Sequence, residues 1–308
     1  MSESKICIKL VVHDLNDPES VICPMIFNLD DMVKLRRLGV CGILAGTLPF
    51  AAQQNIFLTI PLKLMVEETI WLVLNGYAEL QLIQGPMTSL MTNILETKGD
   101  ELFKLARDKL LRSFDLQRQY KKEQHALKLQ KLGIDPARDN SSANNKLIES
   151  SLFVETPNDS LTLQYCHQGK SPIDPTLDSM LLNLLISNYS NWNNYLLYQS
   201  LKSQNYVMSP GGRFGGLFIA YPGDPLRYHS HLTIDNALDY YNDPIDFISL
   251  TSGARLGTAV KKLWVIGGVK DENSSTNKAN DIQLNQPETL LTKRNDTSFF
   301  SIEWAGFG

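Results

Sequence analysis

The chain has 308 residues, of which 43% are hydrophobic and 20% are charged, as in an ordinary globular protein large enough for two domains. Its formal net charge of −4 excludes an overall basic field, so RNA binding would need local positive charge or other subunits. No apolar run is long enough to cross a membrane, and the N-terminus lacks the pattern of a signal peptide. The scattered cysteines without a C-x-x-C pair fit buried thiols, not a disulfide framework; they are Cys7, Cys23, Cys41 and Cys166. We expect a soluble, intracellular protein without membrane insertion.

Residues 1–95 are predicted to form an N-terminal α+β domain. The patterns of apolar residues predict strands over Ile6–Val12, Val21–Phe27, Gly39–Leu48 and Asn55–Ile60. A short helix is expected over Asp30–Leu38, ending at Gly39. A second is expected over Leu64–Asn75, opened by Pro61 and stopped by Gly76.

Residues 96–172 are predicted to be a charged helix followed by a linker. Lys98–Leu132 has a helical pattern with ten basic and five acidic residues, and its apolar stripe thins beyond Leu116. A solvated linker helix and an RNA-binding helix are both compatible with this pattern. The polar stretch Ile134–Asn145 predicts a disordered segment that extends in patches to about residue 172.

Residues 173–308 are predicted to form a second α/β domain. Apolar periodicity predicts helices over Leu177–Ile186 and Trp192–Leu201, and a short helix over Arg255–Lys262. The predicted strands are Phe214–Tyr221, a strand that begins at Tyr228 and His229, Ile245–Leu250, Leu263–Val269 and Ser298–Phe307. A polar segment separates the last two of these strands. Helices followed by strands with one helix between them indicate a mixed sheet.

The segment around Tyr221 and His229 carries the strongest chemical signal. A glycine-rich strand ends at Tyr221, a Pro-Gly-Asp-Pro turn follows, and His229 comes directly after the turn. Strand alternation would place His229 and His231 on one face, so a phenol and an imidazole would meet across the turn. Ordinary packing is the alternative role for each residue. A metal site at the two histidines lacks a third ligand at suitable spacing, so no metal is expected.

A phenol, an imidazole and a lysine suit the metal-independent cleavage of RNA by its own 2′-hydroxyl. Such cleavage needs a base for the 2′-hydroxyl proton, a cation for the phosphate oxygens and an acid for the leaving oxygen. Histidine suits the acid, while a tyrosine base needs nearby cations to lower its pKa. Lys261 and Lys262 lie close in the sequence, and only one of two adjacent helical residues would face the site.

With these residues in view, the chain resembles the tRNA-splicing endonuclease, in particular the eukaryotic subunit that cuts the 3′ splice site. The resemblance is carried by Phe-Gly-Gly-x-Phe-Ile-Ala-Tyr-Pro-Gly-Asp-Pro-Leu-Arg-Tyr-His-Ser-His over 214–231 and by Ser-Gly-Ala-Arg-Leu-Gly-Thr-Ala-Val-Lys-Lys-Leu over 252–263. Further matches are the C-terminal Ile-Glu-Trp and two N-terminal stretches, 46–58 and 60–68. The asparagine-rich linker is similar to fungal members.

The resemblance implies roles for five residues. Tyr221, His229 and Lys262 match the catalytic set, which leaves His231 and Lys261 outside it. Two more residues match a pair that clamps a bulged nucleotide by cation–π stacking and reaches toward the partner's cleavage site; they are Arg255 and Trp304. Strand packing is the alternative role for the tryptophan.

The resemblance also implies a restriction-endonuclease-like catalytic domain, no cofactor, and products with 2′,3′-cyclic phosphate and 5′-hydroxyl ends. The expected partners are intron-containing pre-tRNA and the other subunits of a heterotetramer, one further catalytic and two structural. The location would be the nucleus or the cytosolic face of the mitochondrial outer membrane. The alternative functions are a non-catalytic RNA-binding or structural subunit of this complex and, third, a metal-dependent nuclease of the same fold. The apolar terminal strand is consistent with edge pairing to a partner.

Overall fold

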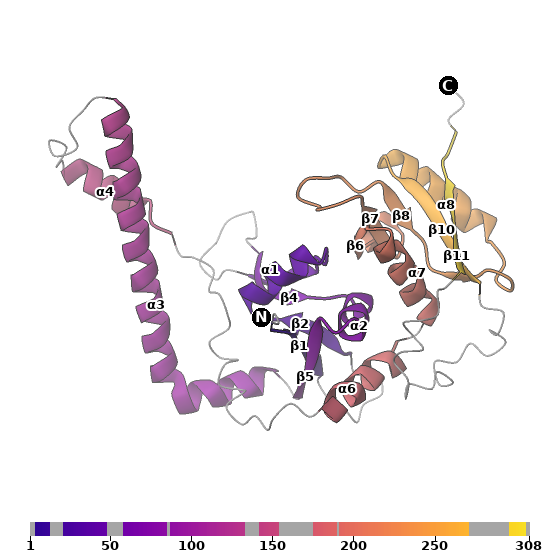
Figure 1. Cartoon of the computed structure of the whole chain (residues 1–308), viewed down its shortest axis with the longest axis horizontal. Helices are drawn as coiled ribbons and strands as arrows, with labels where there is room; N and C mark the ends of the chain where they lie inside the picture. The colour runs from indigo at the N-terminus through magenta and orange to yellow at the C-terminus, as the bar shows by residue number, and fades with distance from the viewer. Residues whose placement is uncertain are drawn as a thin grey trace. The chain divides into compact units, whose positions relative to one another are not determined.

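A computed structural model describes residues 4–12, 21–47, 58–84, 87–132, 142–153, 175–189, 191–270 and 296–305 (Figure 1). The chain divides into two compact units, one formed by residues 1–86 and 170–308 and the other by residues 87–169. The first unit contains two sheets with helices, which confirms the predicted mixed α/β fold. The predicted domain boundaries at residues 95 and 172 stay predictions.

The N-terminal sheet has five strands in the order β3-β4-β2-β1-β5. These strands are β1 (Ile6–Val12), β2 (Cys23–Ile26), β3 (Ile43–Thr47), β4 (Leu58–Lys63) and β5 (Ala78–Gln84). β1 pairs in parallel with β5, and the other pairs are antiparallel. Ile6, Ile8 and Leu10 alternate along β1 and are all buried, so one face of the sheet lies against the core.

Two helices accompany this sheet, α1 (Leu29–Arg37) and α2 (Val66–Leu74). The Asn28 side chain accepts hydrogen bonds from two backbone N–H groups at the start of α1, a role for which asparagine is favoured. Gly76 follows α2 with a φ of 73°, which confirms it as the predicted stop.

The predicted role of Pro61 is wrong, because this proline lies inside β4 and not at the start of a helix. α2 begins instead at Val66, where the Glu68 carboxylate accepts the Met65 N–H at 2.8 Å and satisfies a free donor of the first turn. β5 was not predicted, and part of the predicted strand Asn55–Ile60 lies outside the described residues.

The C-terminal sheet has the order β11-β10-β8-β7-β6, and the short β9 (Leu238–Asp239) also pairs with β10. The other strands are β6 (Val207–Pro210), β7 (Phe218–Tyr221), β8 (Leu232–Ile234), β10 (Leu263–Lys270) and β11 (Asp296–Ile302). β10 runs parallel to β8 and antiparallel to β11, so the sheet is mixed as predicted. Its helices are α6 (Pro175–Ser187), α7 (Trp192–Ser203) and α8 (Phe247–Ala259).

Several predicted C-terminal elements are wrong. The predicted buried strand over Ile245–Leu250 is the start of α8, where Asp246 caps the first turn by accepting two backbone N–H groups. Phe247 and Ile248 are 76% and 78% exposed, so their apolar character did not indicate burial. β7 begins only at Phe218, after the 3₁₀ turn η2 (Gly212–Phe214), and β11 ends at Ile302.

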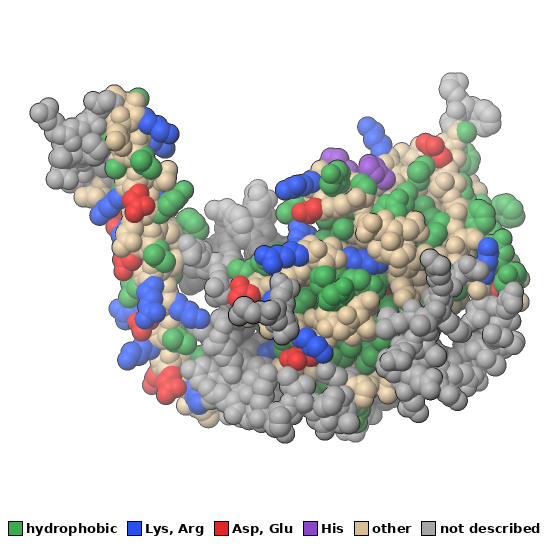
Figure 2. All heavy atoms as spheres, in the orientation of Figure 1, with side chains coloured by type: hydrophobic (Ala, Val, Ile, Leu, Met, Phe, Trp, Pro, Cys, Tyr) green, Lys and Arg blue, Asp and Glu red, His purple; other side chains and the backbone are tan. Residues whose placement is uncertain are grey.

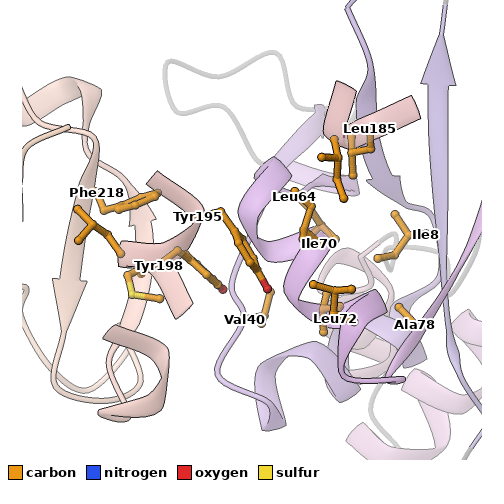
Figure 3. Packing of buried hydrophobic residues seen from close by; sticks show 14 of the residues in the cluster. Ile8, Val40, Leu64, Ile70, Leu72, Ala78, Leu185, Tyr195, Tyr198 and Phe218 are labelled. Carbon is orange, nitrogen blue, oxygen red and sulfur yellow. The ribbon is translucent and has the colours of Figure 1, made fainter. Parts of the chain in front are cut away.

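The two sheets share one hydrophobic core through α7. Tyr195 and Tyr198 of this helix are fully buried and lie between Phe218 of β7 and the N-terminal core residues Val40 and Ile70 (Figure 3). Tyr198 meets Phe218 edge to face, with ring centroids 5.9 Å apart. The catalytic-type sheet is therefore packed on the same core as the N-terminal sheet.

Polar contacts at this junction add to the packing. Lys202 at the end of α7 donates to the carbonyl oxygens of Leu38 and Gly39 at 2.7 and 2.6 Å, and its ammonium lies 5.1 Å from the Trp71 ring centre. The Tyr189 hydroxyl donates to the buried Glu67 carboxylate at 2.6 Å. Both contacts tie the C-terminal helices to α1 and α2.

The second unit is a pair of helices, α3 (Met87–Lys131) and α4 (Ser142–Ser150). α3 confirms the predicted charged helix and is interrupted by non-helical backbone at Lys98. The prediction of a disordered linker is wrong for residues 142–153, because α4 forms there and contacts α3. Residues 133–141 lie outside the described part, as do Cys166 and the predicted polar segment after Asp271. Among the described residues, no helix is long and apolar enough to cross a membrane.

Glu68 makes the stability of the shared core depend on pH. Its side chain is 1% exposed, and burial raises its pKa to about 7 although the Met65 and Gly42 N–H groups favour the ionised form. The folded protein therefore binds a proton at Glu68 that the unfolded chain releases near its ordinary value of 4.5. This group's contribution to stability is greatest at low pH and is lost as pH rises from about 4.5 to 7.

We expect Glu68→Gln to weaken this pH dependence, because glutamine resembles the protonated side chain. Urea unfolding of both proteins between pH 5 and pH 8 measures the pH dependence of the free energy of unfolding. The free energy of unfolding of the original chain should fall more over this range than that of the variant. Parallel curves would contradict the assignment to Glu68.

Candidate active site

Tyr221 is the last residue of β7, and a structured turn follows it. The backbone carbonyl of Asp224 accepts the N–H groups of Arg227 and Tyr228 at 2.8 and 3.0 Å, and its carboxylate accepts the Leu226 N–H at 3.0 Å. Asp224 therefore organises the turn with both its backbone and its side chain, as aspartates in turns do. This confirms the sequence prediction of a reversal directly after Tyr221.

The turn is also held from the N-terminal sheet's helix α1. Arg36 approaches the Asp224 carboxylate at 3.4 Å and donates to the Cys41 sulfur at 2.9 Å. This ion pair is partly exposed, so its energetic contribution is modest, but it places α1 against the segment between Tyr221 and His229.

His229 lies in the loop before β8, so the prediction that it begins a strand is wrong. Its neighbour His231 donates its backbone N–H to the Ala220 carbonyl of β7 at 3.2 Å. The His231 carbonyl accepts the Leu263 N–H of β10 at 2.9 Å. The loop is therefore fixed between two strands, and the imidazoles of His229 and His231 are both exposed.

Lys262 reaches this loop from the position directly before β10. Its ammonium donates to the Ser230 carbonyl at 3.0 Å and to the Ser230 hydroxyl, and it lies 4.8 Å from the centre of the Phe214 ring. Partial burial lowers the pKa of Lys262. Because Ser230 directly follows His229, these contacts hold Lys262 against the histidine loop, which the backbone hydrogen bond from His231 to Ala220 joins to the end of β7.

The predicted helical position of Lys262 is wrong. α8 ends at Ala259, Lys261 adopts a left-handed backbone with φ 57°, and the Lys262 N–H returns to the Gly257 carbonyl at 2.8 Å. Lys262 therefore leaves the helix and enters β10, while Lys261 is exposed at the helix end. Arg255 and Lys262 are not two residues of one helix face.

Arg255 and Trp304 lie together, as the resemblance implied. The Arg255 guanidinium carbon is 5.6 Å from the centre of the Trp304 ring, within range of a cation–π contact. The Trp304 backbone N–H donates to the Thr258 hydroxyl of α8 at 3.3 Å. Trp304 follows β11 and is not part of it, so the prediction that it lies on the terminal strand is wrong.

Sequence reasoning missed two contributors to the site. Ser230 is 6% exposed and accepts hydrogen bonds from the Lys262 ammonium. Phe214 places an aromatic face beside the same ammonium. The phenylalanine precedes two glycines, and the serine lies between the two histidines. A polar residue that is buried between two exposed ones is not visible as a pattern in the sequence.

Small residues bring α8 close to β10. A side-chain carbon at Gly253 would lie 2.2 Å from the Trp264 ring, and one at Gly257 would lie 2.7 Å from the Lys262 carbonyl oxygen. Gly253, Ala254 and Gly257 are therefore the packing face of α8, and their small size sets how close Arg255 and Lys262 lie to the sheet.

We expect Gly253→Ala to destabilise the protein by about 1–3 kcal/mol, the usual effect of overpacking a filled interior. Gly212→Ala is the matched control, because a side-chain carbon there meets open space. Urea unfolding measures both. Equal stability of the two variants would contradict the close packing of α8 on Trp264.

Among the described residues, no three or more His, Cys, Asp or Glu side chains lie together as a metal site would require. Figure 2 shows the histidine side chains beside lysine and arginine side chains at one edge of the larger unit. The site thus offers general acid–base groups and cations to a polyanionic ligand.

Comparison with known proteins agrees with this chemistry. The TSEN34-like N-terminal domain family matches residues 23–82, and the tRNA intron endonuclease catalytic C-terminal domain family matches residues 191–277. The tRNA-splicing endonuclease subunit SEN34 of Saccharomyces cerevisiae is 46% identical over 297 residues, which cover 92% of this chain and 99% of that protein. The chain belongs to the Sen34 family of tRNA-splicing endonuclease subunits.

Two more relatives are similar to this chain, one over most of its length and one over a shorter stretch. The probable tRNA-splicing endonuclease subunit sen34 of Schizosaccharomyces pombe is 33% identical over 278 residues, covering 87% of this chain and 89% of that protein. The mouse subunit Sen34 is 40% identical over 72 residues, 23% of this chain and 22% of that protein. Membership of the Sen34 family makes this chain a subunit of an endonuclease complex and confirms the family resemblance.

Proposed function

We propose that this chain is the catalytic subunit that cuts intron-containing pre-tRNA at the 3′ splice site. The observation that carries the proposal is the contact between Lys262 and Ser230, which joins a cation to the loop of His229 beside the end of Tyr221's strand. The fungal relatives named above are tRNA-splicing endonuclease subunits and match nearly the whole chain, which supports the same substrate here.

In the proposed reaction Tyr221 removes the proton from the 2′-hydroxyl before the scissile phosphate. The 2′-oxygen then forms a bond to phosphorus, and the bond from phosphorus to the 5′-oxygen breaks. His229 donates a proton to the departing 5′-oxygen, which leaves as a 5′-hydroxyl, and the other product ends in a 2′,3′-cyclic phosphate. The proposed reaction consumes no water and uses no divalent ion.

Lys262 is proposed to stabilise the extra negative charge on the phosphate oxygens. Its hydrogen bonds to Ser230 hold the ammonium in place before the substrate arrives. Electrostatic stabilisation by a group that is already positioned avoids reorganisation during the reaction.

Arg255 and Trp304 are proposed to hold a bulged nucleotide. Their side chains already contact each other and both are exposed, so a base can stack against these planar faces. Arg255 lies near the C-terminal end of α8, which Lys262 follows, and the pair is proposed to hold a nucleotide other than the one at this chain's own scissile phosphate. The clamped nucleotide is proposed to support the cut at the 5′ site, which the partner subunit makes.

The proposed assembly is a heterotetramer with one further catalytic and two structural subunits. β11 lies at the edge of the C-terminal sheet and exposes 53% of Phe300, which is consistent with pairing to another subunit. The proposed location is the nucleus or the cytosolic face of the mitochondrial outer membrane.

We expect His229→Ala to lower the rate of 3′ cleavage by about a hundredfold to ten-thousandfold, because the leaving oxygen loses its acid. The 5′ cut should continue. The measurement is cleavage of prefolded pre-tRNA by the reconstituted complex in EDTA, with the ends of the products mapped. The expected ends are 2′,3′-cyclic phosphate and 5′-hydroxyl.

His231→Ala is the matched control, since that residue contributes its backbone and not its imidazole to the contacts described above. An equal defect would identify His231 as the acid. Unchanged 3′ cleavage by the His229 variant would instead favour a structural, non-catalytic subunit. A strict need for Mg²⁺ together with 5′-phosphate ends would overturn the mechanism.

The clamp is tested by a double-mutant cycle on Arg255→Ala and Trp304→Ala. Stacking of a base on an aromatic side chain contributes about 1–3 kcal/mol, so each variant should slow cleavage roughly ten- to a hundredfold. The double variant should be little worse than either single one, and the loss should appear chiefly at the 5′ site. Additive losses, or losses at the 3′ site alone, would show that the two residues do not act as one clamp.

A further inference from the structure

The second unit carries a concentration of positive charge that the rest of the chain lacks. Residues 98–132 contain ten of the 29 basic residues and five of the 33 acidic ones, so the remainder has 19 basic and 28 acidic residues and a net charge of −9. The charge is uneven within α3 itself. Residues 98–115 hold five basic and four acidic residues, whereas residues 116–132 hold five basic and one acidic.

The basic half of α3 is held against α4 as a defined hairpin. Arg118 makes two hydrogen bonds to the Glu149 carboxylate at 2.7 and 3.1 Å. The Gln117 amide both donates to the Phe153 carbonyl at 2.8 Å and accepts its N–H at 3.1 Å. These paired contacts fix the chain that follows α4 along the side of α3, so the surface between the helices is preformed.

An open groove of about 310 Å³ lies on this hairpin. Four polar side chains of α3, spaced by three or four residues along one face, line one wall; they are Lys121, Gln124, His125 and Lys128. Leu147, Ile148 and Ser151 line the other. No acidic residue lines the groove, and the acidic partner of the hairpin, Glu149, is already paired with Arg118.

We propose that this hairpin, residues 116–132 and 142–153, binds the phosphate backbone of the pre-tRNA away from the cleavage sites. The inference rests on the proposed function only in taking pre-tRNA as the ligand. Cations spaced along a helix face match a polyanion whose charges repeat along a strand. The Lys121 ammonium lies 5.8 Å from the centre of the Phe153 ring, and Tyr120 of the same helix is 62% exposed; aromatic and basic side chains combine in this way on RNA-binding surfaces.

A protein partner is the competing occupant, because Leu116, Leu127 and Leu132 are also exposed. The centre of a protein–protein interface is depleted in lysine, however, whereas lysines line this groove and surround it. The charge therefore favours RNA, and assembly of the complex serves as a separate measurement.

The test compares two triple variants of the complete chain in the reconstituted complex. One removes Lys122, Lys128 and Lys131, all exposed and outside the contacts that hold the hairpin. The matched control removes Lys104, Arg107 and Arg112 from the charge-balanced half of the same helix, also exposed. All six are replaced by alanine, which is compatible with a helix, and circular dichroism checks that helix content is kept.

Binding of pre-tRNA with 2′-deoxy residues at both cut sites is measured by fluorescence anisotropy between 50 and 300 mM KCl. We expect the first variant to raise Kd about tenfold at low salt and to reduce the slope of log K against log salt by about one per lost contact. The control should keep both values close to those of the original complex. Because the substrate is uncleavable, failure of the catalytic assignment would not change this result.

Unchanged Kd and salt slope in the first variant would overturn the proposal. Equal losses in both triple variants would also overturn it, because they would reflect the net charge of the complex and not this hairpin. If the first variant loses subunit assembly while the salt dependence of pre-tRNA binding stays unchanged, the hairpin binds a protein and not RNA.

Discussion

The burial of α7 between the two sheets is the constraint on which the larger unit depends. One side of this helix meets β7 through Tyr198 and Phe218, and its end is anchored to α1 through Lys202. Five residues of the helix belong to the same buried cluster as residues of both sheets; they are Tyr195, Leu196, Leu197, Tyr198 and Leu201. The catalytic-type half of the chain is therefore positioned by a structure that extends back to the first strand.

The candidate site combines three segments that are joined mostly by backbone contacts. Ala220 and Leu263 hold the histidine loop between two strands, and the Lys262 side chain adds hydrogen bonds to Ser230 within it. Backbone contacts of this kind keep their geometry when exposed side chains change. This explains how both histidines remain on the surface, open to a large substrate, while their loop stays fixed.

The sequence predicted the strands with alternating or continuous burial, such as Ile6–Val12 and Leu263–Val269, because their periodicity reflects packing directly. It also placed Arg255 beside Trp304, through a resemblance and not through any pattern of spacing. The sequence-based prediction failed where apolar residues are exposed, as at the start of α8. It also failed where the path of a loop determines the position of a residue, as at Lys262 and the histidines. Ser230 and Phe214 gain their roles only from contacts between distant segments.

The ion pair between Arg36 and Asp224 connects the first forty residues to the turn that follows Tyr221. A substitution in α1 would thus reach RNA processing without touching any residue that meets RNA. In a screen for cells that accumulate unspliced transcripts on warming, mild lesions at the front of the gene are therefore expected beside stronger ones in its last third. In this sense the N-terminal part of the chain contributes to the shape of the candidate site.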